Sequence, residues 1–156
     1  MNTTTPYKKK QKGRFLTIIL IVIPLCLLYF SYAKTGSKPL PIFVAIIISI
    51  LFFSLAIIFY QLCITIDNEK ITASFGIGFP KRIMLLKDID LNTIEKTTSN
   101  LRTGIGIRIT SKGWLWNVKF GDAIYFQNKN KTQTFLVGTD DFETIHEILK
   151  NKHYEL

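Results

Sequence analysis

The sequence predicts a two-helix transmembrane hairpin followed by one small α+β domain. Two uncharged apolar runs, residues 15–33 and 40–62, are separated by only six residues. From residue 63 onward, short alternating runs between turn residues indicate strands, and one amphipathic segment near the end indicates a helix. Once the apolar runs are assigned to a bilayer, the rest of the 156 residues suffices for one compact domain.

Residues 1–14 precede the first apolar run and form a predicted basic cytoplasmic tail. We expect its bases to orient the chain in the membrane; they are Lys8, Lys9, Lys10, Lys12 and Arg14. The formal net charge is +9, and residues 1–38 supply +7 of it without an acid. Residues 67–156 hold 13 Lys/Arg against 11 Asp/Glu, the balance of an ordinary solvated domain. The basic pI therefore does not indicate nucleic-acid binding, and we expect no nucleic-acid partner.

The two apolar runs have the length of membrane-spanning helices. As helices they would extend about 28 Å and about 34 Å, against a hydrocarbon core of about 30 Å. Neither run carries the regular polar face that a helix at the surface of a soluble core would show. Residues 34–39 contain Gly36 and Pro39 and predict a short extracytoplasmic turn, so the two helices return antiparallel.

Both termini of such a hairpin face the same compartment. Five bases precede the first span and only Lys34 and Lys38 lie in the connecting loop, so the positive-inside rule places the C-terminal domain in the cytoplasm. We therefore expect a multi-pass protein of the plasma or inner membrane. A secretory signal ending at Ser31-Tyr32-Ala33 is the alternative, although the apolar run exceeds the usual length of about 7–15 residues.

Small side chains mark one face of the second predicted helix. Ala45, Ser49 and Ala56 fall near this face, and small residues let two transmembrane backbones approach closely. We expect them to contact the first helix of the hairpin; contact with a second copy of the chain is the alternative.

The predicted domain covers residues 63–152, and a tail at 153–156 follows it. Residues 63–66 and 70–75 alternate at period two around a turn and predict a β-hairpin. Further β-like runs follow at 82–86, 91–98, 105–110, 115–118, 123–128 and 134–137. These runs predict an antiparallel barrel or sandwich of about seven strands. Asp140 and Asp141 then favour a helix start, and we expect the helix that follows to cap the domain.

Several short motifs follow one another in this segment: GIGIR at 104–108, GWLWNV at 113–118, DAI at 122–124 and VGTDD at 137–141. Together with the strand order and the final helix, they resemble the bacterial pleckstrin-homology-like (PH-like) domain membrane protein family over about residues 62–152. The resemblance implies a binding or scaffolding module attached to paired transmembrane helices. It brings no catalytic residues to this chain.

Basic residues suggest where an anionic surface could be bound. The turn Asp67-Asn68-Glu69-Lys70 carries two acids and one base, so we do not expect phosphoinositide recognition there. Lys81 and Arg82 could join the N-terminal bases in a weaker contact with an anionic leaflet. The alternative is that these bases only set the topology.

Trp114 and Trp116 are two residues apart, so on a strand both indoles lie on the same side of the sheet. Such a face is either core or an exposed contact for the bilayer or a protein partner. Both alternatives stay open at this point.

No catalytic, metal or cofactor site is predicted. Cys26 and Cys63 lie in or beside the apolar runs, which excludes a disulfide framework and a thiolate zinc site. We expect a non-enzymatic binding module that presents a surface to a protein partner at the cytoplasmic face of the membrane, with Trp114, Trp116, Lys81 and Arg82 as candidate contacts. The alternative is an accessory or immunity-type small membrane protein that acts through its hairpin.

Overall fold

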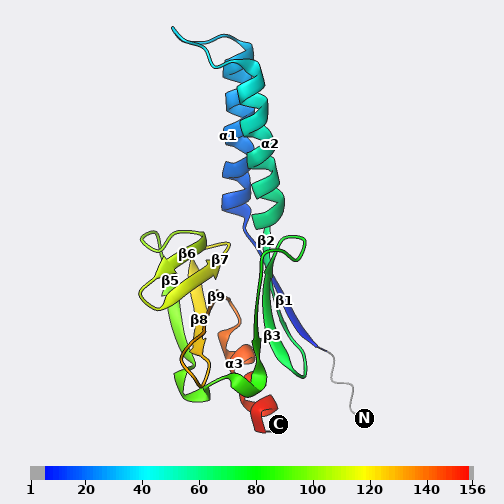
Figure 1. Cartoon of the computed structure of the whole chain (residues 1–156), viewed down its shortest axis with the longest axis vertical. Coiled ribbons are helices and arrows are strands. Elements are labelled where there is room, and N and C mark those ends of the chain that lie inside the picture. The colour runs from blue at the N-terminus through cyan, green and yellow to red at the C-terminus, as the bar shows by residue number, and fades with distance from the viewer. Residues whose placement is uncertain (1–5, 155–156) are drawn as a thin grey trace.

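The computed structural model describes residues 6–154, and two long helices project from one end of a β-rich domain (Figure 1). Helix α1 spans Arg14–Tyr32 and helix α2 spans Ile42–Phe59. Both are long and apolar enough to cross a membrane, and only 17% of the most apolar 18-residue stretch of each is buried. Because a core helix of a soluble domain is mostly buried, the predicted hairpin is consistent with this exposure.

The two helices pack against each other through small and polar side chains. The buried residues of α2 are Ala45, Ser49 and Ala56. Ser49 Oγ donates to the carbonyl of Ala45 at 2.7 Å and approaches that of Pro24, in α1, at 3.4 Å. The small-residue face of α2 therefore lies inside the hairpin, where the sequence predicted it.

The predicted basic tail is wrong over residues 7–12, which form strand β1 (Tyr7–Lys12). This strand pairs antiparallel with β2 (Gln61–Ile66), from Lys12 opposite Gln61 to Tyr7 opposite Ile66. The second predicted span, 40–62, also ends early, because Gln61 and Leu62 belong to β2. The helical hairpin thus continues directly into a paired β-ladder, without a flexible linker.

Strand β1 is held by polar side chains on its inner face. Tyr7 Oη donates to Asp141 at 2.7 Å, and Gln11 Nε2 donates to the carbonyl of Gly138 at 2.7 Å. Lys9 Nζ lies 3.4 Å from the same Asp141 carboxylate. Hydrogen bonds from Thr144 and Tyr7 hold the pKa of Asp141 below its usual range. Burial and the neighbouring Asp141 carboxylate raise the pKa of the Tyr7 hydroxyl above its usual value. These contacts tie the N-terminal strand to the start of the last helix.

The strands form two sheets. Sheet 1 has the order β1-β2-β3-β4, with β3 at Lys70–Phe75 and β4 at Lys81–Leu85. Two short 3₁₀ turns, η1 (Leu86–Asp88) and η2 (Leu91–Thr93), lead to sheet 2. Sheet 2 has the order β5-β8-β9-β7-β6, with strands at Glu95–Ser99 (β5), Gly106–Thr110 (β6), Gly113–Asn117 (β7), Gly121–Gln127 (β8) and Thr134–Gly138 (β9).

The sequence prediction of about seven antiparallel strands needs two corrections. The predicted domain contains eight strands, β2 to β9, with β1 as a ninth that comes from before the hairpin, and β7 pairs with β9 in parallel, with Leu115 opposite Leu136. Strand β9 lies between β8 and β7, so it meets one neighbour antiparallel and the other parallel. The coarser prediction, a helical hairpin followed by an α+β domain, agrees with the structure.

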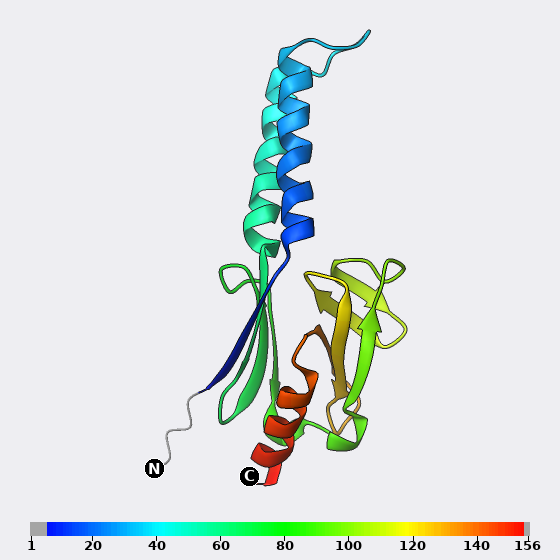
Figure 2. The ribbon, with the colours of Figure 1, turned by 180° about the vertical axis from the view of Figure 1, so that it is seen from behind.

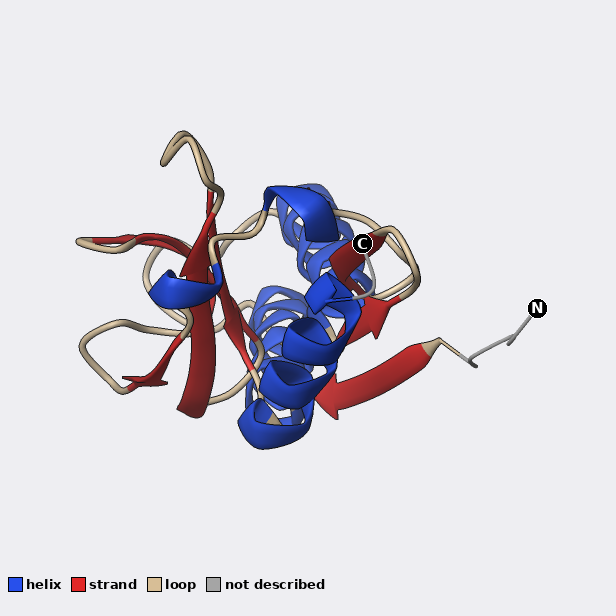
Figure 3. Ribbon diagram, turned by 90° about the horizontal axis from the view of Figure 1, so that it is seen from below, coloured by secondary structure: helices blue, strands red, loops and turns tan. Residues whose placement is uncertain are grey.

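One hydrophobic core lies between the two sheets and is closed at both ends. Helix α3 (Phe142–Tyr154) inserts Ile145 and Leu149 at the end far from the hairpin, and Figures 2 and 3 show it between the sheets. At the other end, Ile58 and Phe59 at the base of α2 pack against the same core. The predicted C-terminal helix is present, and it continues to Tyr154 into the predicted tail. The hairpin and the domain therefore share one packed interior.

Candidate functional site

The outer face of sheet 1 gathers lysines from three strands. The register places Lys10, Cys63, Ser74 and Lys81 in one row across all four strands. The next row away from the hairpin contains Lys8, Thr65, Thr72 and Ile83. We call this outer face the lysine face; its lysines are Lys8, Lys10, Lys12, Lys70 and Lys81.

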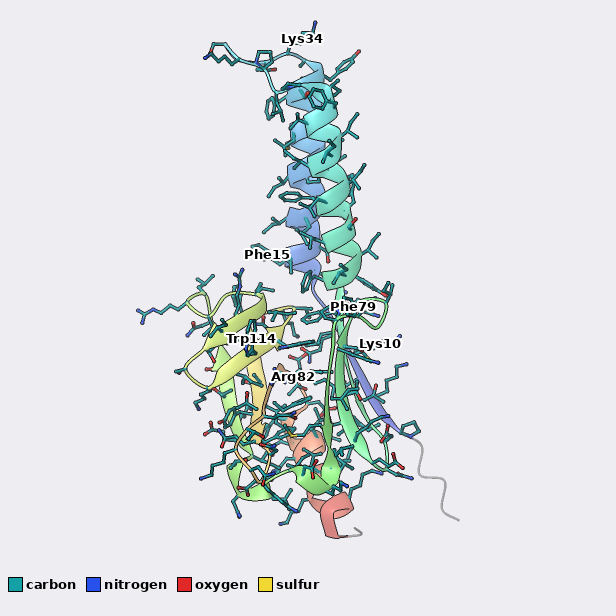
Figure 4. All side chains as sticks on the ribbon, viewed as in Figure 1. Lys10, Phe15, Lys34, Phe79, Arg82 and Trp114 are labelled. Atoms are coloured by element: carbon teal, nitrogen blue, oxygen red, sulfur yellow. The ribbon has the colours of Figure 1, made fainter. Side chains whose placement is uncertain are left out.

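The centre of the lysine face is made of small side chains. Thr65, Thr72 and Ser74 are half-buried there, and Cys63 is only 8% exposed. Lys8, Lys10 and Lys12 of β1 stand at one edge and Lys81 of β4 at the other, and all four are exposed. In Figure 4, Lys10 lies on the side of sheet 1 that faces away from sheet 2. The face therefore offers a centre of small side chains between a row of three lysines on β1 and a single lysine, Lys81, on β4, where Ile83 and Leu85 are the other outward residues.

No acid lies among the outward-facing residues of β1 to β4 in the described part of the chain. The ion pairs among the described residues involve other lysines: Lys9 with Asp141, Lys96 with Asp122, Lys112 with Glu95 and Lys119 with Asp140. The nearest acids, Asp67 and Glu69, lie in the β2–β3 turn at the end of the face far from the hairpin. Most of the positive charge of this face is thus not neutralised by the chain itself.

Lys81 and Arg82, predicted together as contacts, point to opposite sides of sheet 1. Lys81 pairs with Ser74 on the outer face, whereas Arg82 pairs with Ala73, which is fully buried in the core. Burial lowers the pKa of the Arg82 guanidinium from its usual value. The structure therefore keeps Lys81 with the N-terminal lysines and removes Arg82 from that surface.

Trp114 and Trp116 lie on one side of β7, as predicted, but in different surroundings. Trp116 is 8% exposed and stacks on Phe75 with ring centroids 5.3 Å apart. Trp114 is 48% exposed and pairs with Ile109, which is 75% exposed. Trp116 is thus a core residue, and Trp114 belongs to sheet 2, away from the lysine face.

No family model matches this chain, and no curated protein matches it. The resemblance to PH-like domains therefore stays a prediction. Among residues 6–154, no three His, Cys, Asp or Glu side chains gather as ligands for a metal ion.

The five N-terminal bases, predicted to act as one cluster, lie in different surroundings in the structure. Lys8, Lys10 and Lys12 join the lysine face, Lys9 turns inward to Asp141, and Arg14 begins α1. The alternation of Tyr7, Lys9 and Gln11 with the outward lysines has period two, which is the signal of a strand. Because the inward residues are polar, that signal was not visible in the pattern of apolar residues.

Proposed function

We propose that this chain is a membrane-anchored, non-enzymatic binding module of the PH-like kind, which presents its lysine face to an acidic protein partner. The observation that supports this proposal is the set of five lysines on one outer face that holds no acid. Charge complementarity across an interface speeds encounter and rejects partners of the same charge. Four ion pairs elsewhere in the domain involve different lysines, so this face is available to a partner.

The dimensions of the lysine face suit a protein segment. Strands lie about 4.8 Å apart, so three steps from β1 to β4 separate the two lysine edges by about 14 Å. An α-helix with its side chains is about 10–12 Å wide, and an extended strand is narrower. Small side chains at the centre would let the backbone of such a segment approach closely, with its acids reaching the lysines at either edge.

Two other anionic partners fit this face less well. The strands of sheet 1 run along the long axis of the molecule, as the helices do, so the face stands upright on a bilayer and does not lie flat on it (Figure 1). Non-specific binding of single-stranded nucleic acid relies on aromatic side chains that stack on bases. The outward-facing residues of sheet 1 include no aromatic ring and no arginine among residues 7–12, 61–66, 70–75 and 81–85.

The proposal places α1 and α2 across the plasma or inner membrane, with the domain in the cytoplasm. We expect Lys129→Cys, in the exposed turn after β8, to resist an impermeant maleimide in intact cells and to react after permeabilisation. Ser37→Cys, in the exposed loop between the helices, is the matched variant and should react in intact cells. Labelling of Lys129→Cys in intact cells would show that the domain lies on the other side of the membrane. Full-length protein left in the supernatant after high-speed centrifugation would reject the membrane placement.

A photo-crosslinking amino acid in place of Thr72, at the centre of the lysine face, tests the partner. We expect crosslinks in native membranes to an acidic protein segment, with a yield that falls as the salt concentration rises. Charge reversal of Lys8, Lys10, Lys12 and Lys81 to Glu should lower the yield by about tenfold or more, since like charges across an interface cost several kcal/mol. Maleimide labelling of Lys129→Cys in the same variant checks that the loss of three N-terminal bases has not changed the orientation.

Two controls make this result specific. The same crosslinker in place of Thr97, on β5 of sheet 2 and also half-buried, should not capture the segment. Reversal of four exposed lysines elsewhere, Lys87, Lys129, Lys131 and Lys150, should leave the yield unchanged. Crosslinks that survive reversal of the lysine face, or that lead to nucleic acid, would contradict the proposal. Unchanged cellular function after that reversal would favour the alternative in which the hairpin acts by itself.

A further inference from the structure

A groove runs between the base of the helical hairpin and the edge of sheet 2. Its volume is about 280 Å³. Leu16, Leu20 and Leu55 line it from α1 and α2, and Ile105 and Ile107 line it from the start of β6. The wall on the hairpin side is continuous with the apolar surface of the helices, so the groove suits a hydrocarbon chain.

Arg108 lines the same groove and supplies its positive charge. Its side chain is exposed, and Nε donates to the carbonyl of Ile105 at 3.2 Å. A guanidinium carries five N–H donors, so this single bond leaves its outer edge available for an anion. No carboxylate pairs with Arg108 among residues 6–154.

A second cavity, of about 460 Å³, adjoins the first through Arg108. Arg102 and the hydroxyl residues Thr103, Thr110 and Ser111 line it, and none of its lining residues is acidic. Gly104 keeps the backbone close to Arg108, because a Cβ there would lie only 3.3 Å from Arg108 Nε. Arg108 therefore stands between an apolar groove and a polar, basic cavity.

In the membrane placement proposed above, this arrangement lies at the depth of the lipid phosphates. With 19 and 18 residues, the helices are about 27–28 Å long, close to the thickness of the hydrocarbon core of about 30 Å. The domain surface around their base must then enter the headgroup layer. Exposed apolar side chains in the loops at this end agree with that depth: Ile77 is 78%, Phe79 69% and Leu101 83% exposed, and Figure 4 shows Phe79 beside the hairpin base.

We propose that this composite site binds an anionic phospholipid of the surrounding bilayer. One acyl chain lies in the groove along Leu16, Leu20 and Leu55, and the phosphate lies against the guanidinium of Arg108, with Arg102 and the hydroxyls facing the headgroup. Arginine binds phosphate through two parallel N–H donors, which matches the free edge of Arg108. The inference rests on the membrane placement proposed above and is independent of the lysine face.

The site can be tested with full-length protein that has been delipidated in an uncharged detergent. Native mass spectrometry during titration with dioleoylphosphatidylglycerol should show a saturable first lipid, with dioleoylphosphatidylcholine binding more weakly. Arg108→Gln should weaken this binding by about tenfold, because it removes a charge-assisted hydrogen-bond donor to the phosphate. Arg108→Lys, which keeps the charge without the planar fork, should give an intermediate value.

Lys129→Gln is the matched control, since it removes one exposed positive charge from the turn after β8 and should leave the affinity unchanged. The emission of Trp114 and Trp116 checks that each variant is folded. An equal loss in the control would show an effect of net charge and reject a site at Arg108. Full competition by inorganic phosphate would show that the acyl chain contributes no affinity and would reject a lipid as the occupant. If the unsubstituted protein sediments with membranes but binds no lipid saturably, this inference alone is rejected and the membrane placement stands.

Discussion

Replacing Phe75 by alanine should lower the free energy of unfolding by about 3–5 kcal/mol, the range for removing a fully buried aromatic ring. Phe75 is 0% exposed and lies on the inner face of β3. Its ring meets Phe59 of α2 edge-on, with centroids 4.9 Å apart, and stacks on Trp116 of β7 at 5.3 Å. One side chain thus joins the base of the hairpin, sheet 1 and sheet 2, so its loss leaves a cavity that all three border.

Denaturant unfolding of the full chain in detergent, followed by tryptophan emission, measures this loss. Both tryptophans lie on β7, so their emission reports on the domain and not on the helices. Phe79→Ala is the matched control: this ring is 69% exposed in the loop after β3, and its removal should change the unfolding free energy by less than about 0.5 kcal/mol. Similar losses in the two variants would contradict the packing described for Phe75.

The hairpin could be predicted from sequence because its signal is local. An uncharged run of about 20 residues specifies a membrane-length helix whatever it later contacts, and α1 and α2 both lie almost wholly within the predicted runs. Similarly, each predicted β-like run overlaps a strand, because the alternation of side chains belongs to the strand itself. The largest shift is at the end of α2, since apolar Leu62 faces the core from β2.

The pairing of strands, in contrast, depends on contacts between distant residues. Lys10 and Lys81 share a row only because β2 and β3 lie between them in a fixed register. A shift of one residue in any of these pairings would move a lysine to the inner face. The parallel pairing of β7 with β9 has no local signal either, because both strands show the same alternation in parallel and antiparallel sheets.

The tryptophan pair shows the same difference between a local signal and a contact with distant residues, within one strand. The period of two correctly predicted one side for both indoles, yet Phe75 covers Trp116 and leaves Trp114 half exposed. Phe75 comes from the other sheet, about 40 residues earlier in the chain, so no spacing on β7 indicates where the core ends. Candidate contacts read from residue type alone therefore included a core residue, Trp116.

Gly76→Ala should lower the free energy of unfolding by about 2–5 kcal/mol, through a strained backbone and an overlap that cannot relax. Gly76 has a φ of +45°, a conformation that costs an L-residue about 1–2 kcal/mol. A Cβ there would lie 2.5 Å from the carbonyl oxygen of Ile57 and closer still to that of Ile58, both in the last turn of α2. Two hydrogen bonds with Gln61, each 2.9 Å long, fix the backbone at this position.

Gly78→Ala separates the cost of the strained backbone from the cost of the steric overlap with α2. Gly78 also has a positive φ, +108°, but a Cβ at this position would meet no heavy atom within 4 Å, and the loop around it is exposed. Its substitution should therefore cost only the backbone contribution, about 1–2 kcal/mol. The difference between the two variants, measured by the same unfolding assay, reports the contact between sheet 1 and α2. Because that contact sets how the lysine face stands below the hairpin, equal losses at Gly76 and Gly78 would mean that the domain is not held rigidly against α2.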